Sequence, residues 1–226
     1  MKIQHPETWP ETVDAAILIQ EQLKSLVVTT DELKSIQYVA GVDVGFFDNY
    51  TISQAAVAVL SFPDLQLQEQ AISQRQTTFP YLPGFLSFRE IPVILDALEK
   101  LTITPDLIIC DGQGIAHPKR LGLACHLGIL IDVPTIGAAK SKFIGTHQEL
   151  AAARGSWQPL MDNGEVIGAV VRSRTNVKPL YVSPGHRISL ETAIDYVLEC
   201  TPKYRLPETT RWADYLASQS ERSNVT

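Results

Sequence analysis

Hydrophobic and polar positions change their spacing several times along the chain, and each change predicts a new element. Over residues 13–27 the apolar positions recur at helical spacing, which favours a helix with one buried face. Three strand-like runs follow at 38–47, 54–62 and 65–72, and the turn residues Pro63 and Asp64 separate the last two. The third run alternates apolar and polar residues, so the three are predicted to form an antiparallel meander with one solvated face.

The second half of the chain alternates between helical and strand-like patterns. Helices are predicted at about 89–100, 119–131, 189–200 and 208–219, strands at 106–110 and 134–139, and a hairpin at Asn163-Gly164. Three antiparallel strands followed by parallel ones predict an α/β fold, a mixed sheet with helices on both faces. This is the element order of the ribonuclease H-like fold. Because no repeat or linker interrupts it, we expect a single domain over residues 1–226.

Composition narrows the class of protein. The chain has 226 residues, of which 45% are hydrophobic, as expected of a soluble globular protein. No apolar run reaches the ~18 residues of a membrane span, and the first residues do not resemble a signal peptide. We therefore expect a cytoplasmic protein with no membrane partner. The cysteines, Cys110, Cys125 and Cys200, lie far apart, which disfavours a disulfide framework or a zinc site.

The net charge of −6 argues, at first sight, against binding of nucleic acid. Its distribution changes this view. Residues 1–110 hold 6 basic and 14 acidic side chains, whereas residues 111–226 hold 13 basic and 11 acidic ones. The asymmetry permits a basic face on an acidic body, although a modest excess of lysine is also typical of ordinary solvated surface.

Three carboxylates occupy unusual places in this pattern. Asp43 lies inside the apolar run "AGVDVGF", where burial of a lone carboxylate is unfavourable unless it is paired or bound to a cation. Asp111 follows "DLIIC" directly, at the end of a strand where α/β sheets bind ligands. Each also has a structural explanation: Asp43 could face solvent, and Asp111 could cap the next turn.

Glu90 has the strongest structural alternative, because "SFRE" (87–90) fits a helix capping box. Pro92 argues against that start, since its missing N–H would fall past the first turn. A helix that begins nearer Arg89 would place Pro92 in the first turn and turn Glu90 toward the sheet, and we favour this second arrangement.

Taken together, the three acids can converge on one point of the predicted sheet. Carboxylates without histidine or thiol at ligand spacing make a hard oxygen site, which suits Mg²⁺, with Mn²⁺ as a substitute. Such a site performs phosphoryl chemistry. After Asp111, the glycines of "DGQG" would let the backbone approach a ligand, and Lys119 and Arg120 would contact phosphate.

With these residues assembled, the sequence resembles the endonuclease V family, the deoxyinosine 3′-endonucleases. The matching segments span nearly the whole chain and are "VAGVDVGF" (39–46), "FPYLPGFLSFRE" (79–90), "DGQGIAHPKRLGLACHLGILIDVPTIGAAKS" (111–141), "SPGHRIS" (183–189) and "YRLPETTRWAD" (204–214). The resemblance implies a ribonuclease H-like fold. It also implies Mg²⁺-dependent hydrolysis of the second phosphodiester bond 3′ to a deaminated adenine, leaving 3′-hydroxyl and 5′-phosphate ends.

The resemblance also implies a role for individual residues. The metal ligands would be Asp43, Glu90 and Asp111, with Lys140 near the scissile phosphate and Asp214 as a further ligand or base, where some members carry histidine. The segment "PYLPG" (80–84) resembles the family's wedge, in which Tyr81, flanked by Pro83, fills the gap left by a displaced base. Gly84 and Gly112 would border the hypoxanthine pocket, and the remaining substrate-binding candidates are His117 and Arg120.

Several alternatives stay open at this point. Tyr81 could be an exposed aromatic, His117 a residue held by packing, and Lys140 a solvated lysine. "GVDVG" also resembles the phosphate-binding turn of actin-like ATPases, but those proteins need a second domain of similar size. A non-catalytic binder would not require three convergent acids, since carboxylates repel phosphate. Another ribonuclease H-like nuclease would lack the wedge. We expect a monomer that acts on deoxyinosine-containing DNA, with inosine-containing RNA or other nucleic-acid structures as the alternative substrates.

Overall fold

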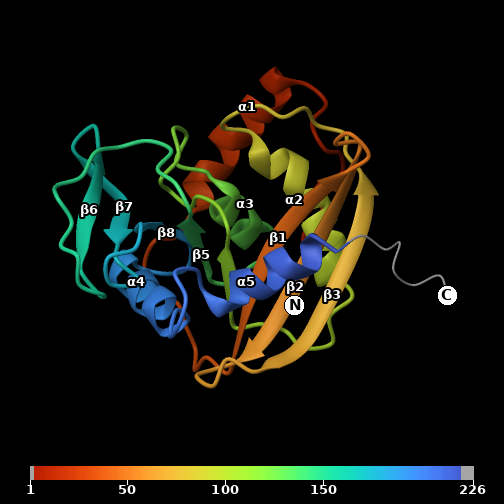
Figure 1. Ribbon diagram of the computed structural model, residues 1–226. Coiled ribbons are helices and arrows are strands. Elements are labelled where there is room, and N and C mark those ends of the chain that lie inside the picture. Colours follow the sequence, from red (N-terminus) through yellow and green to blue (C-terminus); the bar gives the residue numbers. More distant parts are fainter. Residues whose placement is uncertain (1–2, 220–226) are drawn as a thin grey trace.

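The chain folds around one mixed sheet with the strand order β3-β2-β1-β4-β5-β8-β7-β6 in the computed structural model, which describes residues 3–219 (Figure 1). The strands are Tyr38–Phe47 (β1), Ile52–Ser61 (β2), Leu67–Gln76 (β3), Leu107–Cys110 (β4), Thr135–Ala139 (β5), Trp157–Asp162 (β6), Glu165–Val171 (β7) and Leu180–His186 (β8). The helices are Val13–Leu23 (α1), the short 3-10 helix Lys24–Leu26 (η1), Leu86–Leu98 (α2), Leu123–Ile131 (α3), Leu190–Glu199 (α4) and Glu208–Ala217 (α5).

The predicted mixed α/β fold is confirmed. Strands β1, β2 and β3 form the antiparallel meander, and β1, β4 and β5 run parallel to one another. Helices α2 and α3 cover one face of the sheet, and α4 and α5 cover the other (Figure 1). Successive side chains of β1 point to opposite faces of the sheet and so pack into the hydrophobic core on each face. Ala40 and Val42 pack with α2 and α3, while Val39 packs with the opposite layer.

Strand β8 is an element that the sequence analysis missed. Pro184 and Gly185 are typical of turns, yet both lie in this strand between β5 and β7. The ladder accommodates them where its register shifts, between Thr135 and Ile136 of β5. Through β8 the β6–β7 hairpin is joined to the rest of the sheet. That hairpin is confirmed, with positive φ at both Asn163 and Gly164.

Two helices begin at residues other than those predicted. Helix α2 begins at Leu86, and no side chain caps it, so neither of the two starts considered for it is right. Pro92 therefore lies inside the helix, although Glu90 still faces the interior. Helix α3 begins at Leu123 rather than near 119. Arg120 has a φ of 56°, which is incompatible with a right-handed helix, so no helix can run through this residue. Residues 111–122 are a loop.

Helix α5 lies directly on the backbone of β1. A Cβ atom at Gly41 would lie 2.2 Å from the carbonyl carbon of Thr209, and one at Gly45 would lie 2.5 Å from the carbonyl oxygen of Ala217. Asp43 stands between these glycines on the same face of the strand, because side chains alternate along a strand. The two glycines therefore let α5 approach closely enough to bring its own side chains beside Asp43.

Two further expectations concern cysteine and membranes. All three cysteines are free and buried, and burial raises the pKa of Cys125 and of Cys200 to about 12, as expected of inert thiols. Within residues 3–219 none of the helices has the length and apolar character that a membrane crossing requires.

We predict that Gly41→Ala destabilises the fold, because the added methyl group meets helix backbone that cannot move aside without displacing α5. Overpacking of this kind costs about 1–3 kcal/mol, measurable as a lower midpoint of urea denaturation. Gly164→Ala is the comparison: no atom lies within 4 Å of its added Cβ, so only backbone strain at positive φ remains. Wild-type stability of Gly41→Ala would contradict the close packing of α5.

Candidate active site

Three carboxylates from separate elements influence one another at one end of the central strands. Asp43 comes from β1, Glu90 from α2, and Asp111 follows β4. Burial and then the charge of Asp111 raise the pKa of Asp43 to about 6. Burial, followed by the charges of Asp43 and Asp111, raises the pKa of Glu90 well above its ordinary value. The structure therefore brings the three predicted acids together, in surroundings that disfavour their combined negative charge.

Lys140 follows β5 and projects into this acidic cluster. Its Nζ atom lies 2.5 Å from Oδ2 of Asp111 and 3.6 Å from Oδ1 of Asp214, which stands on α5. Burial alone would lower the pKa of Lys140, but the hydrogen bond with Asp111 and the charges of Asp111, Asp214 and Asp43 together outweigh it and leave this pKa raised. The lysine is thus held as a cation, next to Asp111.

The donor chemistry of the cluster fits a hard divalent cation, because Asp43, Glu90 and Asp111 offer only carboxylate oxygens. The raised pKa values of Asp43 and Glu90 point the same way, since a cation would offset the repulsion that causes them. As they stand, however, no three acidic, histidine or cysteine side chains of residues 3–219 are arranged around a common metal position. Asp111 is paired with Lys140 instead. The three carboxylates that could hold a cation are therefore close together but are not arranged around one metal position.

A cavity of about 380 Å³ opens beside the acidic cluster. The loop 77–85, which precedes α2, forms one wall, the loop 111–122 forms the opposite wall, and residues 139–143 close a third side. The predicted residues that border the cavity are Tyr81, Pro83, Gly84, Asp111, Gly112, His117 and Lys140. Because Asp111 and Lys140 belong both to the cavity and to the acidic cluster, a group bound in the cavity lies next to the cluster.

Tyr81 projects from a loop that is otherwise anchored. The Tyr81 side chain is 71% exposed, whereas Phe79, two residues earlier, is buried against Phe85 and Phe88. The guanidinium of Arg89 donates a hydrogen bond of 3.0 Å to the carbonyl of Phe79. The loop therefore holds its apolar base in the core and presents one aromatic ring to solvent at the edge of the cavity.

His117 links the two walls of the cavity. Burial lowers the pKa of His117 to about 4, so its ring is neutral at physiological pH. Nδ1 accepts a hydrogen bond from the N–H of Lys119 at 3.2 Å, and a Cβ atom at Gly84 would lie 3.8 Å from Nε2 of the ring. Gly84 has a φ of 87°, a left-handed conformation that favours glycine at this bend. His117 is thus a wall residue of the cavity, held in place by both loops.

The comparison with known proteins identifies the family. The profile of the endonuclease V family matches residues 21–215. The endonuclease V of Nostoc punctiforme is 67% identical over 219 residues, which cover 96% of this chain and 99% of the relative. The solved endonuclease V of Streptomyces avermitilis has a TM-score of 0.90 at 42% identity, with 96% of each chain covered.

The chain belongs to the endonuclease V family. Its relatives identify it as a nuclease, one of the hydrolases. A further structural relative is the endonuclease V of Ciona intestinalis, solved in complex with a 24mer DNA containing an inosine followed by a ribo-adenosine. It has a TM-score of 0.80 at 28% identity, covering 92% of this chain and 97% of that one.

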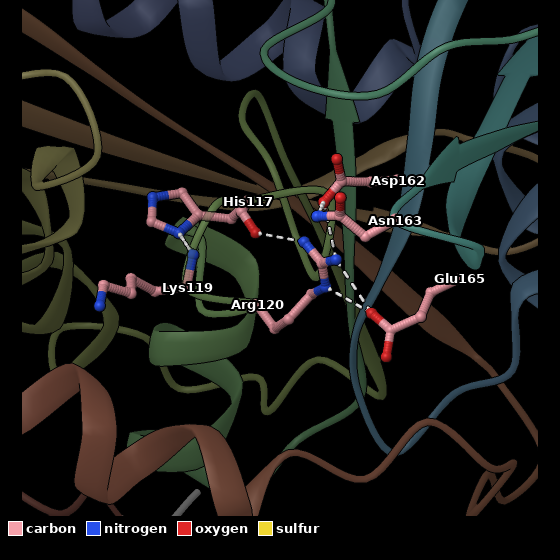
Figure 2. Close-up of polar contacts among 6 residues, drawn as sticks. All are labelled: His117, Lys119, Arg120, Asp162, Asn163 and Glu165. Carbon is pink, nitrogen blue, oxygen red and sulfur yellow. Dashed lines mark hydrogen bonds and ion pairs between the residues drawn. The ribbon is translucent and has the colours of Figure 1, made fainter.

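Lys119 and Arg120, the residues of this endonuclease V-family protein predicted to contact phosphate, do not border the cavity. The Lys119 ammonium pairs with Glu21 of α1 at 3.0 Å. The guanidinium of Arg120 lies between two carboxylates of the β6–β7 hairpin, 2.8 Å from Asp162 and 2.9 Å from Glu165 (Figure 2). The sequence predicts that this guanidinium contacts phosphate. In the structure its hydrogen-bond donors face the carboxylates of Asp162 and Glu165.

Sequence analysis missed three residues that shape the endonuclease V site. Gln20 of α1 donates a hydrogen bond of 2.7 Å to the carbonyl of Gly84, and Phe143 lies with its ring centroid 5.5 Å from that of His117. Ser87 borders the cavity and pairs with buried His126 at 3.1 Å. Ser87 lies within the segment 79–90 that resembles the family, whereas no neighbouring residue in the sequence indicates the contacts of Gln20 or Phe143.

We predict that Asp43→Asn stabilises the metal-free protein at pH 8. The folded-state pKa of Asp43, about 6, lies above its ordinary value of 3.8, so ionisation of Asp43 opposes folding. This penalty is fully present above pH 6 and disappears below pH 3.8. The variant should therefore gain up to about 3 kcal/mol of unfolding free energy at pH 8 in EDTA, and nothing near pH 3.5.

The control for this measurement is Asp64→Asn, at an exposed turn, which should unfold like the wild type at both pH values. Urea titration with EDTA present measures all three proteins. A wild-type or lower stability of Asp43→Asn at pH 8 would show that the Asp43 charge is not disfavoured by the fold.

Proposed function

We propose that this protein is a DNA repair endonuclease that recognises deoxyinosine and hydrolyses the second phosphodiester bond 3′ to the lesion. The products are a 3′-hydroxyl and a 5′-phosphate end. One observation carries the proposal: Asp111 and Lys140 belong both to the cavity and to the acidic cluster, so a lesion base and the cleaved strand can be held by one surface. The inosine-containing DNA bound by the Ciona intestinalis relative supports this substrate.

Recognition of the base uses the cavity and the exposed ring beside it. An enzyme that examines a base in a duplex takes it out of the stack, at a cost of a few kcal/mol. Tyr81 enters the vacated space, and the stacking of bases on its ring offsets part of that cost. At the cavity, the backbone at Gly84 and Gly112 approaches the displaced hypoxanthine without interference from a side chain.

Catalysis combines a cation with the charges of this chain. Mg²⁺, or Mn²⁺ in its place, would be held by Asp43, Glu90 and Asp111. When bound, it supplies Lewis-acid activation of water and neutralises charge on the leaving oxygen. Lys140 holds its positive charge beside Asp111, where it stabilises the negative charge that develops on the scissile phosphate. Asp214 orients Lys140 from the α5 side, 3.6 Å from its Nζ.

We expect metal-dependent incision of a duplex that carries one deoxyinosine. With Mg²⁺ or Mn²⁺ the labelled strand should be cut at the second bond 3′ to the lesion, and EDTA should abolish cutting. Asp43→Asn should lose cleavage yet keep its affinity for the inosine strand, because the substitution removes the charge but retains the shape. Cleavage in excess EDTA would rule out the metal mechanism, and a cut at another bond would rule out the assigned position.

The same assay tests the nature of the sugar. Matched oligonucleotides with deoxyinosine in DNA, with one ribonucleotide 3′ of the inosine, and with inosine in RNA should be compared at equal concentration. The ribo-adenosine next to the inosine in the oligonucleotide bound by the Ciona intestinalis relative motivates the second substrate. A kcat/KM that is higher for RNA than for DNA would favour the alternative function, cleavage of inosine-containing RNA.

We also predict that Tyr81→Ala weakens cleavage of double-stranded inosine DNA more than cleavage of the single strand. A stacked base on an aromatic ring contributes about 1–3 kcal/mol, and a single strand has no partner stack to repair. Tyr81→Phe should act like the wild type, because the ring face and not the hydroxyl is needed. Equal losses on both substrates for Tyr81→Ala would leave Tyr81 as an ordinary exposed aromatic residue.

A further inference from the structure

Arg120 joins the cavity loop 111–122 to the β6–β7 hairpin (Figure 2). Its Nε and Nη2 atoms donate to Oε2 of Glu165 at 3.1 and 2.9 Å, and Nη2 also donates to Oδ2 of Asp162 at 2.8 Å. These acids flank the Asn163-Gly164 turn on both sides, and the Asn163 amide bonds to the same Asp162 oxygen. The hairpin thus presents a small acidic clamp, and Arg120 fills it.

The clamp makes Arg120 a poor ligand for phosphate. Its side chain is only 27% exposed, and its donors already face two carboxylates. A phosphate group at this position would meet the negative charges of Asp162 and Glu165 as well as the guanidinium. Hydrogen bonds from a guanidinium to carboxylates are among the stronger and more directional contacts in proteins, so they fix geometry in addition to neutralising charge.

From the clamp the contacts continue to the wall of the cavity. Nη1 of Arg120 donates to the carbonyl of His117 at 3.0 Å, and the backbone N–H of Arg120 donates to the same oxygen at 2.8 Å. The His117 ring borders the cavity, and a Cβ atom at Gly84 in the opposite wall would lie 3.8 Å from its Nε2 atom. A continuous series of contacts therefore runs from the hairpin through Arg120 and His117 to Gly84.

The two halves of the cavity loop have different supports. The inner half is held by β8, because the N–H groups of Gly114 and Ile115 donate to Ser183 Oγ and to the Pro184 carbonyl at 2.8 and 2.9 Å. The outer half, which contains His117, is joined to the hairpin by Arg120. A contact outside the cavity therefore supports the part of the loop that contains His117.

We propose that Arg120 is a positioning residue for lesion selectivity, and that Asp162 and Glu165 are its partners in this role. The clamp sets the position of His117 and thereby the width of the cavity that receives the displaced base. The inference rests on the proposed function, because selectivity has a meaning only for an enzyme that distinguishes hypoxanthine from the normal bases. Arg120 and the two hairpin acids act here through His117 and do not touch the base.

The test compares Arg120→Ala with the double variant Asp162→Asn/Glu165→Gln, which keeps the arginine but removes the charge of its clamp. Both should lower kcat/KM for a deoxyinosine duplex by about 10–100-fold, the size expected when a bound group is slightly misplaced. The ratio of kcat/KM for the deoxyinosine duplex to kcat/KM for the matched adenine duplex should fall as well. Affinity for undamaged duplex and its salt dependence should stay at wild-type values in Arg120→Ala. Arg120→Lys, which retains the charge without the planar fork, should recover part of the loss.

A phosphate contact predicts the opposite behaviour, which makes the experiment decisive. Arg120→Ala would then weaken binding to every sequence alike and lower the salt slope by about one. The double variant would bind undamaged DNA more tightly, because it frees the arginine from its acids. Either result would overturn the positioning role.

Arg187→Ala serves as the matched control. Arg187 also has a positive φ and also bridges two carboxylates, Glu32 at 3.1 Å and Asp132 at 2.6 Å, but it lies away from the cavity. Its loss should leave inosine cleavage and selectivity unchanged, and reduced selectivity in this control would overturn the assignment to the hairpin clamp.

A failure of the positioning role of Arg120 can be distinguished from a failure of the proposed function. If the wild type does not cut inosine DNA, the proposed function has failed, and amide hydrogen exchange still reports on the clamp. Residues 115–122 should then exchange faster in Arg120→Ala and in the double variant than in Arg187→Ala, at equal global stability. Unchanged exchange in that segment would overturn the positioning role independently of activity.

Discussion

Like charges crowd together where strand β4 ends beside Asp43 of β1, and the site is organised around their repulsion. Asp43 is disfavoured as an anion by burial and by the charge of Asp111, and Glu90 by burial and by the charges of Asp43 and Asp111. In water such groups would separate, but the sheet and α2 hold them in place with the free energy of the surrounding hydrophobic core. Lys140 offsets part of this charge through Asp111. The remainder makes the site receptive to a divalent cation.

The close approach of α5 to β1 follows from two missing side chains. Gly41 and Gly45 leave room for helix backbone on the same face as Asp43. As a result Asp214, from the last helix, reaches the ion pair formed by residues of the central strands. Charged side chains from β1, α2 and α5 and from the ends of β4 and β5 thus meet in one small volume, although these elements are far apart in the chain.

The cavity and the acidic cluster share residues in this architecture. The loop that begins with Asp111 continues into the wall of the cavity, so movement of that wall also displaces a member of the acidic cluster. Its inner half is bonded to β8 and its outer half to the β6–β7 hairpin. The hairpin stands at the edge of the sheet, remote in sequence from the acids, and yet supports the same loop. This arrangement gives the outer strands a part in the geometry of the site.

Much of this protein could be read from local pattern. The strand-like runs between residues 38 and 72, the apolar run before Asp111 and the Asn163-Gly164 turn predicted most strands, because strand and turn preferences act over a few neighbouring residues. The acids Asp43, Glu90 and Asp111 stood out for a similar reason, since a carboxylate in an apolar segment needs a compensating partner.

Tertiary structure decided the rest. Strand β8 was hidden by Pro184 and Gly185, whose turn preference is overridden where this part of the strand pairs with β5, while residues 180–182 pair with β7. Gln20 was hidden because its partner, Gly84, lies 64 residues away. The sequence shows the positive charge of Arg120, but only the fold shows that Asp162 and Glu165 surround its guanidinium. The sequence determined which chemical groups are available, and long-range contacts, which leave no periodic trace in the chain, determined which groups meet.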